Sequence, residues 1–391
     1  MVDISICIPT FARSHLIEKT LNRLVEPIQT SQKKFEVVIT DNSLDDKTEL
    51  AIEKFQDLLN IRYHRHHENM GGFLNLLSAY GLATGKFCLY LADDDQLILE
   101  KVEEVCDFLN LHRGVNVVFA PWVCVSPSGS SAQFYKQTEK IASIKRGGHL
   151  NLLLFLLKTN ALPEIFIFRR QHTNLLEIDS QIGQYYLLQA ASFVKQSEVV
   201  FWAEPFYLQT IHEPKPGGDL QTGHVQSMEF WDQYRGGLEV ILAQAGLDAE
   251  EQARIDFLQA IDSFVGQRIL VAINMRLKLD FGSKMDVYLL ALRACALGAE
   301  IALVFSLPTF KKLAAIEFIF EKIQNLDQFD GISCDLDLNL EEKAFLNQKV
   351  MEASLTLVAT NVGNPLRIGE EKNLLIEGKK FSFNDILAQL L

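Results

Sequence analysis

The sequence predicts an α/β fold with a mostly parallel sheet, followed by a helical segment and a small C-terminal α/β domain. Two observations support the parallel sheet. Strand-like apolar runs alternate with helix-like runs over the first 120 residues, as in parallel sheets with right-handed crossover connections. Each of the first four strand-like runs is also followed by an unusual polar cluster. Parallel sheets bind ligands beyond the carboxyl ends of their strands, so these clusters are expected to share one crevice.

The four strand-like runs are expected at residues 3–8, 35–40, 61–64 and 87–91. The last of them, FCLYL, has no polar alternation, which is typical of a strand buried on both faces. Helices are expected between the runs, because apolar residues such as Leu21 and Leu24 recur there at helical spacing. The polar clusters that follow the runs are Thr10, Asp41, residues 69–72 and residues 93–95.

Three consecutive acids, Asp93, Asp94 and Asp95, end the fourth run. Adjacent negative charges at the mouth of a buried strand are costly unless a cation neutralises them. A hard divalent cation that also holds phosphate oxygens fits this place. A solvated turn before the helix expected near Ile98 is the simpler interpretation of an isolated acidic run, but the neighbouring clusters favour the cation.

A glycine pair, Gly71 and Gly72, precedes the next helix. Residues without a Cβ let backbone N–H groups approach a phosphate or a sugar closely. A plain loop and helix start explains the pair about equally well when it is considered alone.

Composition excludes several classes of protein. The 391 residues are 48% hydrophobic and carry a net charge of -13, which argues against a general nucleic-acid binder. The six cysteines are scattered, as expected of reduced thiols in the cytoplasm. Asp3 and Pro9 argue against a signal peptide, and the apolar run at residues 150–157 is too short to cross a bilayer. Contact with the inner face of a membrane is a further expectation.

The ordered motifs SICIPTFAR, VVITDNSLDD, ENMGGFLNLLSAYGLATGKF and LYLADDDQL resemble those of family 2 glycosyltransferases with the GT-A fold, a Rossmann-like nucleotide-diphospho-sugar transferase fold. The likeness is greatest to abequosyltransferase-like members that build bacterial surface polysaccharides. It covers residues 2–111 strongly and continues weakly to about Pro216.

The resemblance implies a set of donor contacts. Asp41 matches the acid that hydrogen-bonds the nucleobase, and Arg13 matches a basic residue that contacts phosphate or the helix that carries it. The floor beneath the base is matched by Pro9, Thr10 and Phe11. The loop and helix beside the nucleotide are matched by Asn69, Gly72 and Asn75.

The resemblance also implies a metal site. Asp93 would face the ribose, Asp95 would ligate Mg²⁺ or Mn²⁺ that bridges the donor diphosphate, and Asp94 would serve either role. FWAEPFYL, at residues 201–208, resembles the final strand of the family and leads to His212, the candidate for a third ligand. His224 is a weaker candidate.

The catalytic base is where the sequence departs from the family pattern. An inverting transferase needs a carboxylate near the acceptor hydroxyl. The family has an acidic pair before an aromatic helix, whereas Gly183 and Gln184 stand there in this chain. Asp179 is therefore the first candidate, with a helix N-cap as its alternative role, and Glu164 is the second.

The expected domains are residues 1–224, a helical segment at 225–282 and a C-terminal domain at 283–391. The Pro- and Gly-rich loop at 213–223 suits a lid over the donor, or else a linker. Further strands are expected at residues 301–305, 331–334 and 355–359. A small separate domain suggests partner docking or homo-oligomerisation.

Together these features predict a metal-dependent inverting glycosyltransferase that moves a sugar from a nucleotide sugar to a saccharide or lipid-linked acceptor. A sugar-phosphate nucleotidyltransferase is the first alternative, although PTFARSHLIEKT lacks its Gly-rich basic loop. A non-catalytic nucleotide-sugar-binding protein is the second, because the acidic pair is missing.

Overall fold

The computed structural model describes residues 2–212, 222–248, 251–301, 306–323 and 338–352, with four short strands at 358–359, 366–367, 374–376 and 379–381. The chain divides into two compact units. Unit 1 comprises Met1–Glu213 and Asp232–Phe264, and unit 2 comprises Pro214–Trp231 and Val265–Leu391. The domain limits expected from the sequence stay a prediction.

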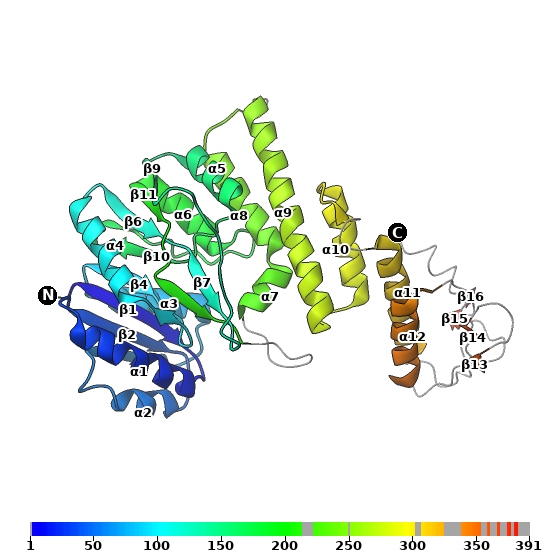
Figure 1. Ribbon diagram of the computed structural model, residues 1–391, viewed down its shortest axis with the longest axis horizontal. Helices are drawn as coiled ribbons and strands as arrows, with labels where there is room; N and C mark the ends of the chain where they lie inside the picture. Colours follow the sequence, from blue (N-terminus) through cyan, green and yellow to red (C-terminus); the bar gives the residue numbers. More distant parts are fainter. Residues whose placement is uncertain are drawn as a thin grey trace. The chain divides into compact units, whose positions relative to one another are not determined.

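Unit 1 is built on an eight-stranded sheet with the order β3-β2-β1-β4-β10-β6-β11-β9 (Figure 1). Its first four strands are parallel, namely β1 (Ile4–Thr10), β2 (Phe35–Asp41), β3 (Ile61–Arg65) and β4 (Phe87–Tyr90). The strands β6 (Val115–Phe119) and β11 (Glu198–Trp202) are also parallel to each other. Two strands run antiparallel to their neighbours, β10 (Phe166–Arg169) and β9 (Ile141–Ile144). The predicted mostly parallel α/β fold is confirmed.

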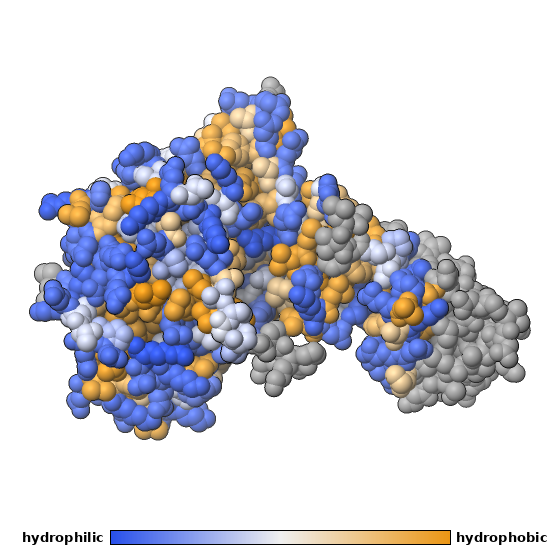
Figure 2. Space-filling model, in the orientation of Figure 1, coloured by the Kyte–Doolittle hydropathy of each residue, from blue (hydrophilic) through white to orange (hydrophobic). Residues whose placement is uncertain are grey.

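Helices that alternate with the strands bury β1, β2 and β4, whereas β3, at the edge of the sheet, is partly exposed. These helices are α1 (Ser14–Thr30), α2 (Lys47–Glu53), α3 (Gly72–Leu82), α4 (Leu99–Leu111), α5 (His149–Thr159) and α6 (Tyr185–Gln196). In α1 the buried positions Ile17, Leu21 and Leu24 follow helical spacing. Phe87, Cys88 and Leu89 of β4 are at most 1% exposed, which confirms a strand buried on both faces. On the face shown in Figure 2, hydrophilic residues cover most of unit 1, with apolar patches between them.

A second sheet has the order β5-β12-β7-β8. Its strands are β5 (Gln96–Leu97), β12 (Tyr207–Thr210), β7 (Trp122–Val125) and β8 (Ser131–Gln133). The expectation of one strand at residues 201–208 is wrong, because the chain leaves β11 at Trp202 and enters the second sheet at Tyr207. Pro205 lies in the break and has no N–H to donate to a ladder. The switch brings β12 against β5, directly after the three acids.

The predicted helical segment is confirmed as α7 (Thr222–Glu229), α8 (Trp231–Gln244) and α9 (Gln252–Leu279). Within unit 1, α8 lies directly on the residues that start α6. The Gln184 N–H donates to the Gln233 carbonyl oxygen at 2.8 Å. A Cβ at Gly236 would lie 2.0 Å from the Ile182 carbonyl oxygen, so only glycine permits this approach.

Replacing Gly236 with alanine should therefore destabilise unit 1, by about 1–3 kcal/mol, because the helix must move away from the loop before α6. Urea denaturation measures the change. Gly81→Ala is the matched control, since no atom lies within 4 Å of a Cβ at that helical position. If both variants are as stable as the wild type, the close packing of α8 contributes little.

The described part of unit 2 contains α10 (Lys284–Ala296), α11 (Leu307–Ile323) and α12 (Leu340–Glu352). A capping box between Ser283 and Asp286 begins α10. Two short antiparallel pairs follow, β13 (Val358–Ala359) with β14 (Leu366–Arg367), and β15 (Leu374–Ile376) with β16 (Lys379–Phe381). Of the expected strands, 331–334 and most of 301–305 lie outside the described residues, and 355–359 is described only at β13. Among the described residues, none of the helices has the length and apolar character needed to cross a bilayer.

Candidate functional site

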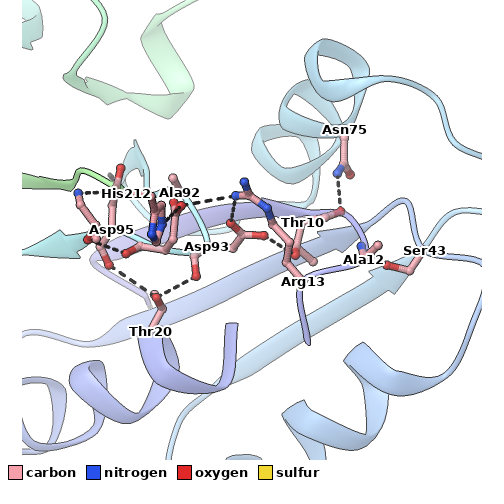
Figure 3. A network of polar contacts seen from close by, with 12 residues as sticks. Thr10, Ala12, Arg13, Thr20, Ser43, Asn75, Ala92, Asp93, Asp95 and His212 are labelled. Carbon is pink, nitrogen blue, oxygen red and sulfur yellow. Dashed lines mark hydrogen bonds and ion pairs between the residues drawn. The ribbon is translucent and has the colours of Figure 1, made fainter. Parts of the chain in front are cut away.

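The polar clusters predicted from the sequence meet at the carboxyl edge of the parallel strands. The end of β1 pairs with the end of β2, so that Thr10 lies opposite Asp41. The Asn75 side chain on α3 donates to the Thr10 carbonyl oxygen at 3.1 Å. The three acids after β4, here called the acidic cluster (Asp93–Asp95), are tied to the same residue through the Thr10 hydroxyl. One edge of the sheet thus gathers the ends of β1 and β2, the start of α3 and the segment after β4, several of whose residues are drawn in Figure 3.

Asp93 is held by residues of β1 and α1. The Thr10 hydroxyl donates to its Oδ2 at 2.6 Å, and the Arg13 guanidinium donates to its Oδ1 at 2.9 Å. The Thr20 hydroxyl, on the apolar side of α1, donates to the Asp93 carbonyl oxygen at 2.9 Å. Thr20 was not among the predicted site residues, although a threonine on the same helix face as Ile17, Leu21 and Leu24 is a polar residue where an apolar one is expected.

Asp94 lies between two nitrogen-bearing side chains. His212 Nε2 is 3.1 Å from Asp94 Oδ2, and Arg13 approaches the same oxygen at 3.5 Å. The backbone here is fixed by the Thr210 hydroxyl, which donates to the Asp94 carbonyl oxygen at 2.7 Å. The structure therefore brings His212 to the acidic cluster, as predicted from its place after the final strand.

Asp95 turns toward the second sheet. The Tyr207 hydroxyl donates to its Oδ2 and the Thr210 N–H donates to its Oδ1, both at 2.7 Å. Tyr207 and Thr210 were not among the predicted site residues, because their contacts with Asp95 depend on the switch of the chain to the second sheet after β11. Asp95 is thus fixed by hydrogen bonds to β12.

Burial sets the electrostatics of the acidic cluster, since the three residues are only 4–8% exposed. It raises the pKa of Asp93, against the lowering effects of Thr10 and Arg13. It raises the pKa of Asp95 to about 7, against the lowering effect of the Tyr207 hydrogen bond and with a further increase from the charge of Asp94. A nearby cation would favour the ionised carboxylates.

Without a bound cation, the protein should lose stability as the pH rises from about 4 to about 7. Asp95 ionises near pH 4 in the unfolded chain but only near pH 7 in the folded protein, so the folded state holds the extra proton in this window. Each pH unit costs at most about 1.4 kcal/mol. Urea denaturation in EDTA from pH 5 to pH 8 measures this, with Asp95→Asn as the control that should flatten the profile. If stability falls equally with pH in the wild type and in Asp95→Asn, Asp95 is not the group that causes the loss.

Asp41 is fully buried and is held by neighbouring residues of the protein. It is 0% exposed, and both carboxylate oxygens accept hydrogen bonds, from the Ser43 N–H at 2.8 Å and from the Tyr63 hydroxyl at 3.0 Å. Tyr63 was not among the predicted site residues. The pairing of β2 with β3 explains the contact. Tyr63 lies opposite Ile39, and Ile39 is two residues before Asp41, so Tyr63 and Asp41 are on the same face of the sheet.

The loop before α3 is fixed by hydrogen bonds to Asn42, which follows β2, and by one hydrogen bond within the loop. Asn42 donates to the Gly71 carbonyl oxygen at 3.1 Å and accepts from the Met70 N–H at 3.3 Å. Asn69 accepts from the Gly71 N–H at 2.9 Å. Gly71 has φ +81°, a conformation that glycine adopts readily, while a Cβ at Gly72 would meet open space.

The predicted floor of the base subsite is partly accessible. Phe11 is 49% exposed and Pro9 is half-buried, whereas Thr10 is 3% exposed and bonded to Asp93. Asn75 is 2% exposed and links β1 to α3. Phe11 is thus the member of this group with the largest accessible surface.

The two candidates for the base differ in placement. Asp179 is exposed in the loop before α6, and it is not the N-cap, since Gln184 accepts from the Leu187 N–H at 3.1 Å. Glu164 is half-buried and comes two residues before β10, which pairs antiparallel with β4. The start of β10 therefore lies at the carboxyl end of β4. Burial, and then the charge of Glu164, raise the pKa of Tyr186 at the start of α6.

The remaining predictions concern the segment after β12. Most of the expected lid or linker, residues 213–221, lies outside the described residues. His224 lies in α7, which belongs to unit 2, and its role as a weaker ligand candidate stays a prediction.

The donor atoms present fit a cation held jointly with a ligand. Within the described residues, no three His, Cys, Asp or Glu side chains are grouped to hold a metal on their own. Mg²⁺ is commonly held by one or two carboxylates together with substrate phosphates. Asp94 Oδ2 and His212 Nε2 form a hydrogen-bonded pair at 3.1 Å, so a carboxylate and an imidazole, both competent metal ligands, lie side by side at the site.

A family model described as "Glycosyl transferase family 2" matches residues 5–175, which include β1, the acidic cluster and β10. This part of the chain is a family 2 glycosyltransferase domain. The likeness suggested by the four ordered motifs is thereby confirmed, together with the GT-A fold class.

Two named bacterial proteins are similar in sequence to the family 2 domain. Over 113 residues it is 33% identical to abequosyltransferase RfbV of Salmonella typhimurium, covering 27% of this chain and 32% of the relative. Over 139 residues it is 27% identical to poly(ribitol-phosphate) beta-N-acetylglucosaminyltransferase TarS of Staphylococcus aureus, covering 35% of this chain and 24% of the relative. The matches thus span about a third and about a quarter of these relatives.

A solved structure is also similar to this chain. It is residues 1–349 of S. aureus TarS in complex with UDP, with 17% identity, a TM-score of 0.48, and coverage of 84% of this chain and 94% of that one.

Proposed function

We propose that the family 2 domain is an inverting glycosyltransferase. It moves a sugar from a nucleotide-sugar donor to a saccharide or lipid-linked acceptor, with the help of a divalent cation, in bacterial surface polysaccharide synthesis. The observation that supports this most is the meeting of Thr10, Asp41 and the buried acidic cluster at one sheet edge. Three buried carboxylates suit a site that binds a cation and a diphosphate together.

The donor nucleoside is assigned to the ends of β1 and β2. The exposed ring of Phe11 gives an apolar surface for the base, and Asp41 with Tyr63 supplies the polar group beside it. Asp93, oriented by Thr10 and Arg13, is assigned to the ribose. These roles agree with the residue types, because bases need a stacking surface and few oriented polar groups.

The cation is assigned to Asp94 and His212, with Asp95 as a further ligand directly or through water. When bound between these residues, Mg²⁺ or Mn²⁺ would neutralise the donor diphosphate and stabilise the charge that develops on it. The chain's own part is to orient the ligands, through Thr210 and Tyr207.

Glu164 is assigned as the base that takes the proton of the acceptor hydroxyl. Its place before β10 puts it at the edge that carries the acidic cluster, whereas Asp179 is exposed on a loop. A carboxylate on the side of the sugar opposite the diphosphate permits attack with inversion. Asp179 is the alternative.

The relatives agree with this chemistry. Their names describe the transfer of abequose by one and of N-acetylglucosamine to poly(ribitol-phosphate) by the other. We extend to this chain the transfer of a sugar to a bacterial polymer, and leave the sugar unspecified. Cytoplasmic location, membrane contact and self-association stay predictions from the sequence.

A thermal-shift panel tests the proposal. UDP, CDP, GDP and dTDP are each added with Mn²⁺ or with EDTA. One diphosphate should stabilise the protein only with Mn²⁺, by about 2.7 kcal/mol at 100 times its dissociation constant. If none does, the donor site assigned here is wrong.

A second candidate function is donor binding without transfer. Gln184 favours it, because it stands where the family pattern has an acid and its side chain caps α6. Release of the nucleoside diphosphate from the matching sugar nucleotide, with an acceptor present, separates the two. Binding without turnover would favour the second candidate.

A further inference from the structure

The acidic cluster already has a cation of its own. Arg13 NH1 lies 2.9 Å from Asp93 Oδ1 and 3.5 Å from Asp94 Oδ2, so one guanidinium bridges two buried carboxylates. In Figure 3 its side chain reaches from the loop after β1 to the acids. Since uncompensated buried charge is unfavourable, this contact supports the folded cluster.

The two contacts of Arg13 are unequal. The one with Asp93 has the length of an ordinary charge-assisted hydrogen bond, whereas the one with Asp94 is at the long limit. Asp94 Oδ2 is also the oxygen that His212 approaches, and it is the carboxylate oxygen assigned above to the divalent cation. A divalent cation bound there would therefore meet Arg13 at the same oxygen.

Arg13 is also placed to contact a ligand. Its side chain is 39% exposed, in contrast to the 7% of Asp94. It follows Ala12, a non-glycine residue with φ 54°, whose N–H donates to Ser43 Oγ at 2.8 Å. That sparsely populated conformation is held by the neighbouring strand end, which fixes the base of the Arg13 side chain. A guanidinium at this point can bind diphosphate oxygens in a bidentate manner.

We propose that Arg13 is an exchangeable counter-ion that couples cation binding to diphosphate binding. Before the donor binds, it neutralises Asp93 and Asp94. When the divalent cation takes the Asp94 oxygen, Arg13 leaves that oxygen and binds the diphosphate that the cation chelates. Arg13 thus weakens binding of the cation alone and strengthens binding of the diphosphate with the cation. The inference rests on the proposed donor site and deepens it.

The test compares wild type with Arg13→Gln by calorimetric titration. With Mn²⁺ alone, Arg13→Gln should bind about fivefold or more tightly than the wild type, because the competing charge is gone. With saturating Mn²⁺, the nucleoside diphosphate found by the panel should bind about fivefold or more weakly. These factors lie at the lower end of coupling between sites. A residue that only supports the fold would not be expected to strengthen Mn²⁺ binding and weaken diphosphate binding when it is replaced.

Two further variants complete the test. Lys54→Gln removes one positive charge from an exposed pair with Glu18 and should change neither affinity. Arg13→Lys keeps the charge and should bind Mn²⁺ alone as the wild type does, but it should bind the diphosphate more weakly because an ammonium group cannot make the bidentate contact. This variant therefore gives a result even if Arg13→Gln is unstable.

The outcomes separate the two proposals. Suppose that the wild type binds the diphosphate, but that Arg13→Gln binds Mn²⁺ no more tightly than the wild type and Arg13→Lys, which both keep the charge. The exchange is then refuted and the donor site stands. If the wild type binds Mn²⁺ but none of the four diphosphates, the proposed function and the exchange fail together.

Discussion

Asp94→Asn should reduce sugar transfer by about 100-fold or more and remove the Mn²⁺-dependent stabilisation by the nucleoside diphosphate. Its Oδ2 is the atom that both His212 and Arg13 approach, so the amide removes the charge at the centre of the site. Loss of one group that stabilises developing charge commonly costs a factor of 100 to 1,000. The steady-state rate of transfer and a Mn²⁺ titration measure the two effects.

The control for this variant is Asp107→Asn on α4, which removes an equal charge from an exposed pair with Lys33. It should leave both quantities unchanged. His212→Ala should weaken Mn²⁺ binding in the same direction as Asp94→Asn. If Asp94→Asn binds Mn²⁺ with wild-type affinity, the cation is held elsewhere in the acidic cluster, and Asp95 becomes the residue to test.

Glu164→Gln should lower kcat by about 100- to 10,000-fold while the donor and Mn²⁺ still bind. The amide keeps the size of the side chain but cannot accept the acceptor proton. Glu164 comes just before β10, and β10 pairs antiparallel with β4, so Glu164 is near the carboxyl end of β4. It is not one of the residues assigned above to the nucleotide. Single-turnover transfer and diphosphate titration separate the chemical step from binding.

Asp179→Asn is the matched variant, because it makes the same chemical change at the other candidate. It should retain most of the activity, since Asp179 is exposed in the loop before α6. Reversed results would assign the base to Asp179. Full activity in both variants would exclude both carboxylates as the base.

The sequence by itself determined the parallel half of the sheet and the edge at which the site lies. Consecutive strands and helices leave few topologies, and the polar residues stand at strand ends, so Thr10, Asp41 and Asp93 had to come together. These contacts follow from the order of elements and from pairing between neighbouring strands. The resemblance to the family also pointed to His212, which lies 3.1 Å from Asp94.

Only the tertiary structure decided how the acids are shared among their partners. The chain leaves the main sheet after Trp202 and joins a second sheet, which places Tyr207 and Thr210 on Asp95. Pairing between residues more than a hundred positions apart has no local signature. Likewise, the ion pairs of Arg13 depend on where its loop places a long flexible side chain. Sequence patterns indicate which residues lie at the carboxyl edge of the sheet, whereas the distances between their side chains depend on how the whole domain packs.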